Sequence, residues 1–141
     1  MQKMTLEETR AFLLSGTRTA AVATTRVDGR PHVAPVWFLL DGDDVIFNTA
    51  ETSEKGRALK RDARVALMID DETPPFAFVA IEGIATLSND PGDLLLWATR
   101  IAARYMGESQ AEAYGRRNGV PGELIVRVTP TKTVAMKDVA D

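Results

Sequence analysis

Cations and a hydroxyl residue gather in one short segment with the sequence TSEKGRALKRDAR, residues 52–64. If Ser53 caps a helix there, Lys55 and Arg57 fall in its first turns, near the positive end of the helix dipole. An exposed cation at that end costs roughly 0.3–1 kcal/mol, and a bound anion would reverse this balance. Free N–H groups near Gly56, the Ser53 hydroxyl and the Lys55 ammonium are together suited to one phosphate. The segment therefore predicts a phosphate site, with Arg57 reaching a second acceptor.

Lys60 and Arg61 fall near the other end of this helix, where the dipole favours cations. The first interpretation of these two residues is therefore a solvated basic face. A nucleic-acid-binding helix over residues 55–64 is a more distant alternative, because no aromatic residues flank the segment and the chain carries a net charge of -3. We expect no nucleic-acid partner.

A second group of interest is the segment PHVAPVWF, residues 31–38. A proline in a strand interrupts the ladder and leaves backbone N–H and C=O groups that can bind the polar edge of a flat ring. Trp37 is then either a wall of that pocket or ordinary core. His32 either donates a hydrogen bond to a substrate carbonyl or is an ordinary hydrogen-bonded histidine.

The composition excludes several other chemistries. The chain has no cysteine and 1 histidine, which rules out disulfides, thiol catalysis, cysteine zinc sites and histidine pairs for a metal. No nucleophile-elbow pattern surrounds a serine. The acidic run at residues 41–44 is typical of a hairpin tip, so we expect no metal in the site.

The length of 141 residues fits one domain, and we expect residues 1–141 to form a single cofactor-binding unit. The first residues, MQKMTLEETRAFL, lack the basic region and apolar run of a signal peptide. No apolar stretch approaches the roughly 20 residues that a membrane helix needs. We therefore expect a soluble cytoplasmic protein without a membrane partner.

Strands must position the two candidate segments, residues 31–38 and 52–64. Asp28-Gly29 and Asp41-Gly42 separate β-rich runs and predict type I′ hairpin turns, hence a three-stranded antiparallel meander. Gly83 indicates a bulge or a close approach in a long strand. The six predicted strands cover residues 19–25, 31–40, 44–49, 63–70, 76–88 and 123–139.

Four helices are predicted beside these strands. Thr5 and Glu8 have capping-box spacing for a first helix, the Ser53 helix follows, and Asp90-Pro91 starts a third that runs to about residue 106. Ser109 caps a fourth helix that ends at Asn118. Because strands and helices do not alternate regularly, the fold class is mainly β with helices (α+β), a mostly antiparallel barrel.

The order of the segments is itself informative. ATTRVDGRPHVAPVWF, then VIFNT, then S-x-K-x-R-x-L with RDARVAL, then EGIA and a final RVTP, resembles the pyridoxamine 5'-phosphate oxidase-like family. The resemblance covers residues 19–134. Within the family, the chain most resembles the actinobacterial branch that uses coenzyme F-420, a deazaflavin. It implies a six-stranded antiparallel split β-barrel of the flavin-reductase or FMN-binding type. It also implies a homodimer with cofactor sites at the subunit interface.

The resemblance assigns roles to particular residues. It implies that the cofactor phosphate is bound by Ser53, Lys55, Arg57 and Lys60, and that Thr49 meets the phosphate or the ribityl chain. Pro35, Val36 and Trp37 would border the deazaflavin ring, with His32 nearby as a substrate contact or proton donor.

The implied function is an oxidoreductase in which reduced coenzyme F-420 delivers hydride to an electron-poor small molecule such as an enone, a quinone or a tetrapyrrole-like compound. An FMN-dependent oxidoreductase is the nearest alternative, and a non-catalytic flavin- or deazaflavin-binding protein is another. Oxidation of vitamin B6 is not expected, because the chain ends in MKDVAD and lacks the Arg/His-rich motif for the substrate phosphate.

Overall fold

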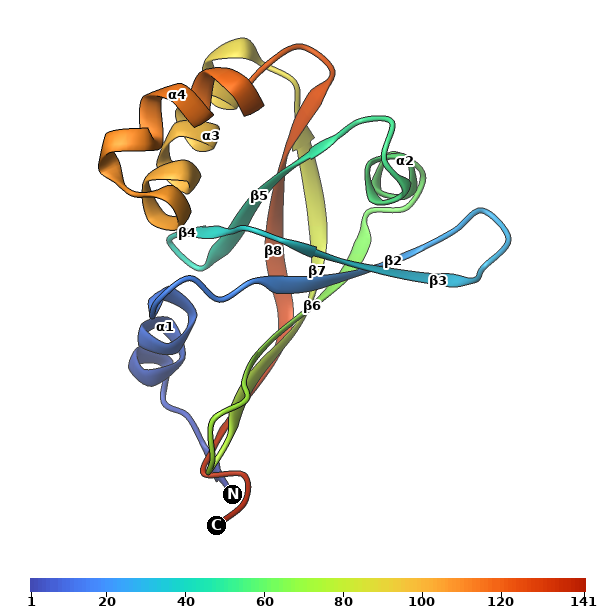
Figure 1. Ribbon diagram of the computed structural model, residues 1–141. Coiled ribbons are helices and arrows are strands. Elements are labelled where there is room, and N and C mark those ends of the chain that lie inside the picture. Colours follow the sequence, from blue (N-terminus) through green and yellow to red (C-terminus); the bar gives the residue numbers. More distant parts are fainter.

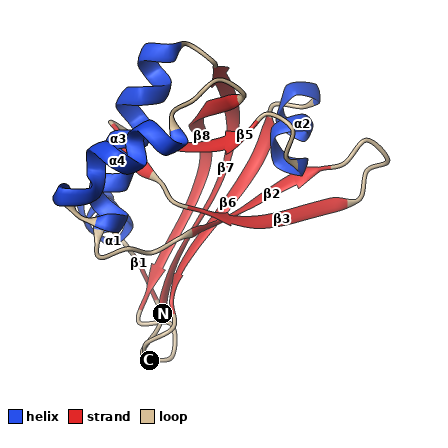
Figure 2. Cartoon of the chain, turned by 45° about the horizontal axis from the view of Figure 1, so that its top comes forward, coloured by secondary structure: helices blue, strands red, loops and turns tan.

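The computed structural model describes residues 1–141 as an α+β fold with one antiparallel sheet and helices at its periphery (Figures 1 and 2). The strands are β1 (Gln2–Lys3), β2 (Ala20–Thr25), β3 (Pro31–Val36), β4 (Leu39–Asp41), β5 (Asp44–Ala50), β6 (Arg64–Asp71), β7 (Ala77–Ser88) and β8 (Glu123–Lys137). The helices are α1 (Leu6–Leu14), α2 (Glu54–Arg61), α3 (Pro91–Met106) and α4 (Glu108–Asn118). No helix is long and apolar enough to span a membrane.

The caps predicted for three helices are present. Thr5 forms the complete capping box of α1, Ser53 caps α2 and Asp90 caps α3. The prediction for the fourth helix was wrong at its start. Helix α4 begins one residue before Ser109 and has no side-chain cap, because α3 turns into it directly through Gly107.

The sheet has eight strands, whereas six were predicted. One additional strand is β1, whose two residues pair with the end of β8 and are too few to show a periodic pattern. The other arises because the predicted strand over residues 31–40 is divided into β3 and β4 at Trp37 and Phe38. At this break the Phe38 backbone bonds to side chains of α3 in place of a neighbouring strand.

The strand order is β3-β2-β6-β7-β8-β5-β4, with β1 paired to β8. Its two edges, β3 and β4, are successive pieces of the same chain segment, and no ladder joins them, so the sheet is not closed. The predicted meander is therefore wrong in one respect. Both hairpins form, but β2 and β5 pair with different halves of the divided strand and lie far apart in the sheet order.

The turns also differ from the prediction. Gly29 and Gly42 have positive φ, but the aspartates before them do not, so neither hairpin has the type I′ geometry. The predicted bulge at Gly83 is confirmed by a shift of the β7–β8 register between Glu82 and Gly83.

The strongly curved sheet encloses the main core, a cluster of 16 buried residues that includes Phe38, Phe47 and Leu59. Helices α3 and α4 lie side by side at one end of the sheet, and α2 lies apart from them (Figures 1 and 2). Leu94 and Trp97 of α3 pack on Ile46 and Ile125 in a second, smaller cluster. The helix pair is thereby fixed to β5 and β8.

Candidate functional site

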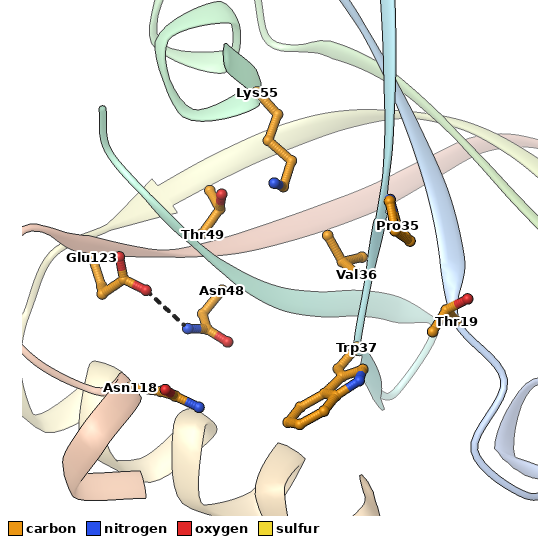
Figure 3. A pocket seen from close by; sticks show the side chains of 9 residues that line it. All are labelled: Thr19, Pro35, Val36, Trp37, Asn48, Thr49, Lys55, Asn118 and Glu123. Atoms are coloured by element: carbon orange, nitrogen blue, oxygen red, sulfur yellow. Dashed lines mark hydrogen bonds between the residues drawn. The ribbon is translucent and has the colours of Figure 1, made fainter. Parts of the chain in front are cut away.

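A cavity of about 400 Å³ opens where the end of β3, β5 and α2 meet the end of α4 and the start of β8 (Figure 3). Its lining contains two charged side chains, one from α2 and one from β8, and a tryptophan. The residues that line it are Thr19, Pro35, Val36, Trp37, Asn48, Thr49, Lys55, Asn118 and Glu123.

The start of α2 is held against the end of β5 by hydroxyl groups. Ser53 Oγ accepts a hydrogen bond from Gly56 N at 3.0 Å and donates one to Ala50 O at 2.8 Å. The Thr49 hydroxyl therefore donates in its 2.9 Å contact with Ser53 Oγ. A side chain at Gly56 would overlap the Ala50 carbonyl oxygen. This close approach brings the next residue back along α2, Lys55, to the cavity.

The Lys55 side chain points into the cavity (Figure 3). It is half-buried, and burial lowers the pKa of its ammonium, while attraction to Glu123 acts in the opposite direction. Lys55 Nζ makes no hydrogen bond with the other residues of the cavity wall. A partly desolvated cation without a direct partner is suited to binding an anion.

The opposite charge comes from Glu123 at the start of β8. Its Oε1 accepts a 3.3 Å hydrogen bond from Asn48 Nδ2. The register explains this contact, because Glu123 pairs with Ala50 and Asn48 lies two residues earlier on the same face of β5. Burial raises the pKa of the Glu123 carboxyl, whereas the Asn48 hydrogen bond and Lys55 act to lower it.

The aromatic wall of the cavity is held from behind by α3. The ring of Trp37 stacks on Tyr105 with a centroid distance of 5.1 Å and an interplanar angle of 5°. The Tyr105 hydroxyl donates to Arg18 O at 2.6 Å and accepts from Phe38 N at 3.1 Å. Arg104 donates to Phe38 O at 2.8 Å, so both backbone groups of Phe38 are bound by α3.

The structure brings together some of the predicted site residues. Those that line the cavity are Pro35, Val36, Trp37, Thr49 and Lys55. Ser53 does not line the cavity, but its hydroxyl is hydrogen-bonded to that of Thr49, which does.

Three other predicted residues lie outside the cavity lining. Arg57 bonds to Thr52 O and pairs with Glu54, and Lys60 pairs with Glu51 at 3.3 Å. His32 is on β3, and its buried Nδ1 has no hydrogen-bond partner. No group of three or more His, Asp or Glu side chains in the chain could hold a metal ion.

The family model for pyridoxamine 5'-phosphate oxidase matches residues 5–137, nearly the whole chain. The chain belongs to the pyridoxamine 5'-phosphate oxidase family. This family has flavin-binding members and includes oxidoreductases, and the fold described above is the fold of that family. No curated protein matches the chain.

Several solved structures are similar to this chain. A conserved hypothetical protein from Mycobacterium tuberculosis is 25% identical with a TM-score of 0.84, over 96% of this chain and 86% of that chain. An F-420 reductase is 27% identical with a TM-score of 0.69, over 87% of this chain and 94% of that chain. The general stress protein 26 from Bacillus anthracis, at 17% identity and a TM-score of 0.71 over 94% and 95%, shares the fold.

In this member of the pyridoxamine 5'-phosphate oxidase family, four cavity residues were not anticipated from the sequence. They are Thr19, Asn48, Asn118 and Glu123. Asn48 lies directly before Thr49, a predicted site residue, and this adjacency was the only sequence feature that pointed to Asn48. Asn118 and Glu123 come from the end of α4 and the start of β8, whose place beside β5 depends on tertiary packing.

We expect that Tyr105→Phe destabilises this family member by about 1–3 kcal/mol, because the buried Phe38 N–H and the Arg18 carbonyl lose their partner. Urea unfolding followed by tryptophan fluorescence measures this change. Tyr114→Phe is the matched control, since Tyr114 lies on α4 against Arg117 and does not bind Phe38. Equal stability of the two variants would contradict the structural role assigned to the Tyr105 hydroxyl.

Proposed function

We propose that this protein is an oxidoreductase that binds reduced coenzyme F-420 in the cavity and reduces an electron-poor small molecule. The observation that carries this proposal is the ammonium of Lys55, half-buried and without a direct partner in a cavity that also has an aromatic wall. The 27% identity to an F-420 reductase supports the choice of cofactor.

The cavity fits the phosphate end of such a cofactor. Lys55 is its cationic donor, and the start of α2 adds the positive end of a helix dipole. Thr49 supplies a hydroxyl oxygen that can still accept a hydrogen bond, since its proton is given to Ser53. Ser53 therefore acts by holding α2 and Thr49 in place.

Arg57 and Lys60 have a secondary part in the proposal. Both are already engaged by carboxylates, Arg57 by Glu54 and Lys60 by Glu51, on the exposed side of α2. They contribute to phosphate binding by exchanging these exposed ion pairs, which individually stabilise little. We therefore assign them a smaller share of the binding free energy than Lys55.

The flat ring of the cofactor fits the wall formed by Pro35, Val36 and Trp37. Pro35 has no N–H, and β3 is an edge strand, so backbone groups at this edge have no ladder partner on one side. Tyr105 stacks behind Trp37 and keeps its ring in one orientation. The wall is thus pre-formed, which lowers the entropic cost of ordering it around a planar ligand.

Reduced coenzyme F-420 supplies hydride when bound, which is the difficult part of the chemistry. This chain's own residues bind the phosphate, orient the ring and shelter it from water. His32, three residues before Pro35 on β3 and outside the cavity lining, is proposed as a substrate contact or proton donor from the family resemblance alone. The acceptors in this proposal are enones, quinones or tetrapyrrole-like compounds.

We also propose that the protein is a homodimer whose open sheet completes the split-barrel arrangement at the subunit interface. A row of apolar cross-strand partners crosses the outer face of the sheet on five neighbouring strands. These residues are Pro35, Ala21, Met68, Ala80 and Val134. Met68 and Val134 are 43% and 39% exposed, and Pro35 also lines the cavity. A second copy on this face would therefore lie beside the ring-binding wall.

A side-by-side titration tests the cofactor. Coenzyme F-420 should bind with a change in its fluorescence at micromolar concentration, whereas FMN should bind more weakly. Tight FMN binding in place of F-420 would favour an FMN-dependent oxidoreductase. Binding of F-420 without oxidation of its reduced form by a panel of quinones and enones would favour a non-catalytic binding protein and contradict the proposed activity.

Lys55→Ala should weaken binding of coenzyme F-420 at least about tenfold, or roughly 1.4 kcal/mol, because a charge-assisted contact with the phosphate is lost. Lys132→Ala is the matched control, since Lys132 lies on β8 outside the cavity. Arg57→Ala and Lys60→Ala should have smaller effects than Lys55→Ala. Unchanged affinity in a folded Lys55→Ala protein would disprove the phosphate assignment.

Met68→Glu should convert the protein from a dimer to a monomer, because it puts a charge in the middle of the apolar row. Sedimentation velocity measures the change. Thr86→Glu, at an exposed position of β7 outside the row, is the control and should remain dimeric. A monomeric wild-type protein would refute the proposed homodimer.

A further inference from the structure

The cavity contains two opposite charges that are not in direct contact. Lys55 enters from α2 and Glu123 from the start of β8 (Figure 3). No ion pair joins them, yet each favours the charged form of the other across the cavity: Glu123 acts to raise the pKa of Lys55, and Lys55 acts to lower the pKa of Glu123. Both side chains are partly removed from water, and interactions between charges are stronger in such an environment than at an exposed surface.

The other groups around Glu123 are neutral or already paired. Asn48 and Thr49 from β5 and Asn118 from α4 carry no charge, so Lys55 is the one other charged side chain in the lining. The other charged residues of α2 and of the turn before it lie outside the lining: Arg57 pairs with Glu54, Lys60 pairs with Glu51, and Arg61 donates to backbone carbonyls. On α4, Arg116 pairs with Glu112 and Arg117 donates to Asn118 Oδ1, and neither arginine lines the cavity. Lys55 is therefore the charge that stabilises ionised Glu123 in the empty cavity.

An anion that binds at Lys55 changes this balance. It neutralises the cation that favours ionised Glu123, and it adds a negative charge to the same partly desolvated space. The Asn48 amide remains bonded to Oε1, which leaves Oε2 free to receive a proton. A neutral carboxyl no longer repels the anion and can donate a hydrogen bond to it or to a neighbouring ligand oxygen.

We infer that Glu123 is a specificity-determining residue that takes up one proton from solvent when an anionic group of the ligand binds at Lys55. This inference rests on the proposed function in placing a phosphate at Lys55. It adds that ligands with a second negative charge near β8 are rejected while Glu123 is ionised, and that binding of any anion in the cavity depends on pH.

The sign of the pH dependence follows from the proton uptake. Burial has already raised the pKa of Glu123 in the empty cavity, and the bound anion raises it further. Between these two pKa values the complex holds more protons than the free protein, so affinity falls as the pH rises through this window. Below the window Glu123 is neutral in both states, and the affinity depends no further on this group.

Glu123→Gln tests this inference, because an amide resembles the neutral carboxyl and removes the proton. Coenzyme F-420 and FMN are each titrated into both proteins. For each ligand, the wild-type dissociation constant is divided by the variant dissociation constant at the same pH, which cancels titration of the ligand itself. We expect the ratio of the wild-type to the variant dissociation constant to approach one toward acid pH, where Glu123 is neutral, and to rise to roughly ten or more at alkaline pH, where Glu123 is ionised. Calorimetry in buffers of different ionisation enthalpy should detect proton uptake on binding to wild type and none through this group in the variant.

Glu82→Gln is the matched control, because it removes the same charge from an exposed residue of β7 outside the cavity. Equal effects of the two variants, or a ratio that does not change with pH, would overturn the assignment to Glu123. If Lys55→Ala still weakens binding in that case, the proposed phosphate site stands alone. If neither F-420 nor FMN binds to any of these proteins, both proposals fall.

Discussion

The backbone of Phe38 is bound by side chains where a neighbouring strand would otherwise bind it. Tyr105 accepts from its N–H and Arg104 donates to its carbonyl, and both residues come from the last turns of α3. Buried backbone groups must have partners, so this contact allows the strand to break without cost to hydrogen bonding. The break separates β3 from β4 and lets the two pieces form opposite edges of one curved sheet.

The cavity and its aromatic wall are consequences of that break. Trp37, the residue before Phe38, lines the cavity and stacks on Tyr105, so the same helix that satisfies the backbone also orients the ring. Strand β5 pairs with β8 in an antiparallel ladder, and their register sets Asn48 against Glu123. The hydroxyls of Ser53 and Thr49 attach α2 to the end of β5 and direct Lys55 toward this polar group. Charge, amide and aromatic ring are thus positioned by separate elements that meet at one bend.

Local chemistry made part of this structure predictable from the sequence. Three predicted features depend on residues near one another in the chain, and all three are present: the Ser53 cap, the place of Lys55 in the first turn of α2, and the bulge at Gly83. Arg57 and Lys60 were grouped with Lys55 by sequence proximity. Arg57 is two residues and Lys60 five residues from Lys55, however, and neither spacing puts two side chains on the same face of a helix. Both side chains lie outside the cavity lining and pair with Glu54 and Glu51.

What the sequence did not reveal depends on long-range pairing. Glu123 reaches the cavity through the β5–β8 register, and Tyr105 reaches Trp37 through the packing of α3. In isolation Tyr105 has the spacing of an ordinary core residue, and Glu123 follows an unremarkable turn. A short helix and an interrupted strand, both singled out in the sequence, border the cavity, whereas the tertiary structure was needed to show that a carboxylate shares it.

The central claim is that one cation, Lys55, and one aromatic wall at the strand break together form the cofactor site. A crystal structure of the protein with coenzyme F-420 tests this most directly. The account predicts a phosphate oxygen about 3 Å from Lys55 Nζ and the deazaflavin ring against Pro35, Val36 and Trp37. A phosphate bound instead by Arg57 and Lys60 on the exposed side of α2, with the ring outside the cavity, would contradict it.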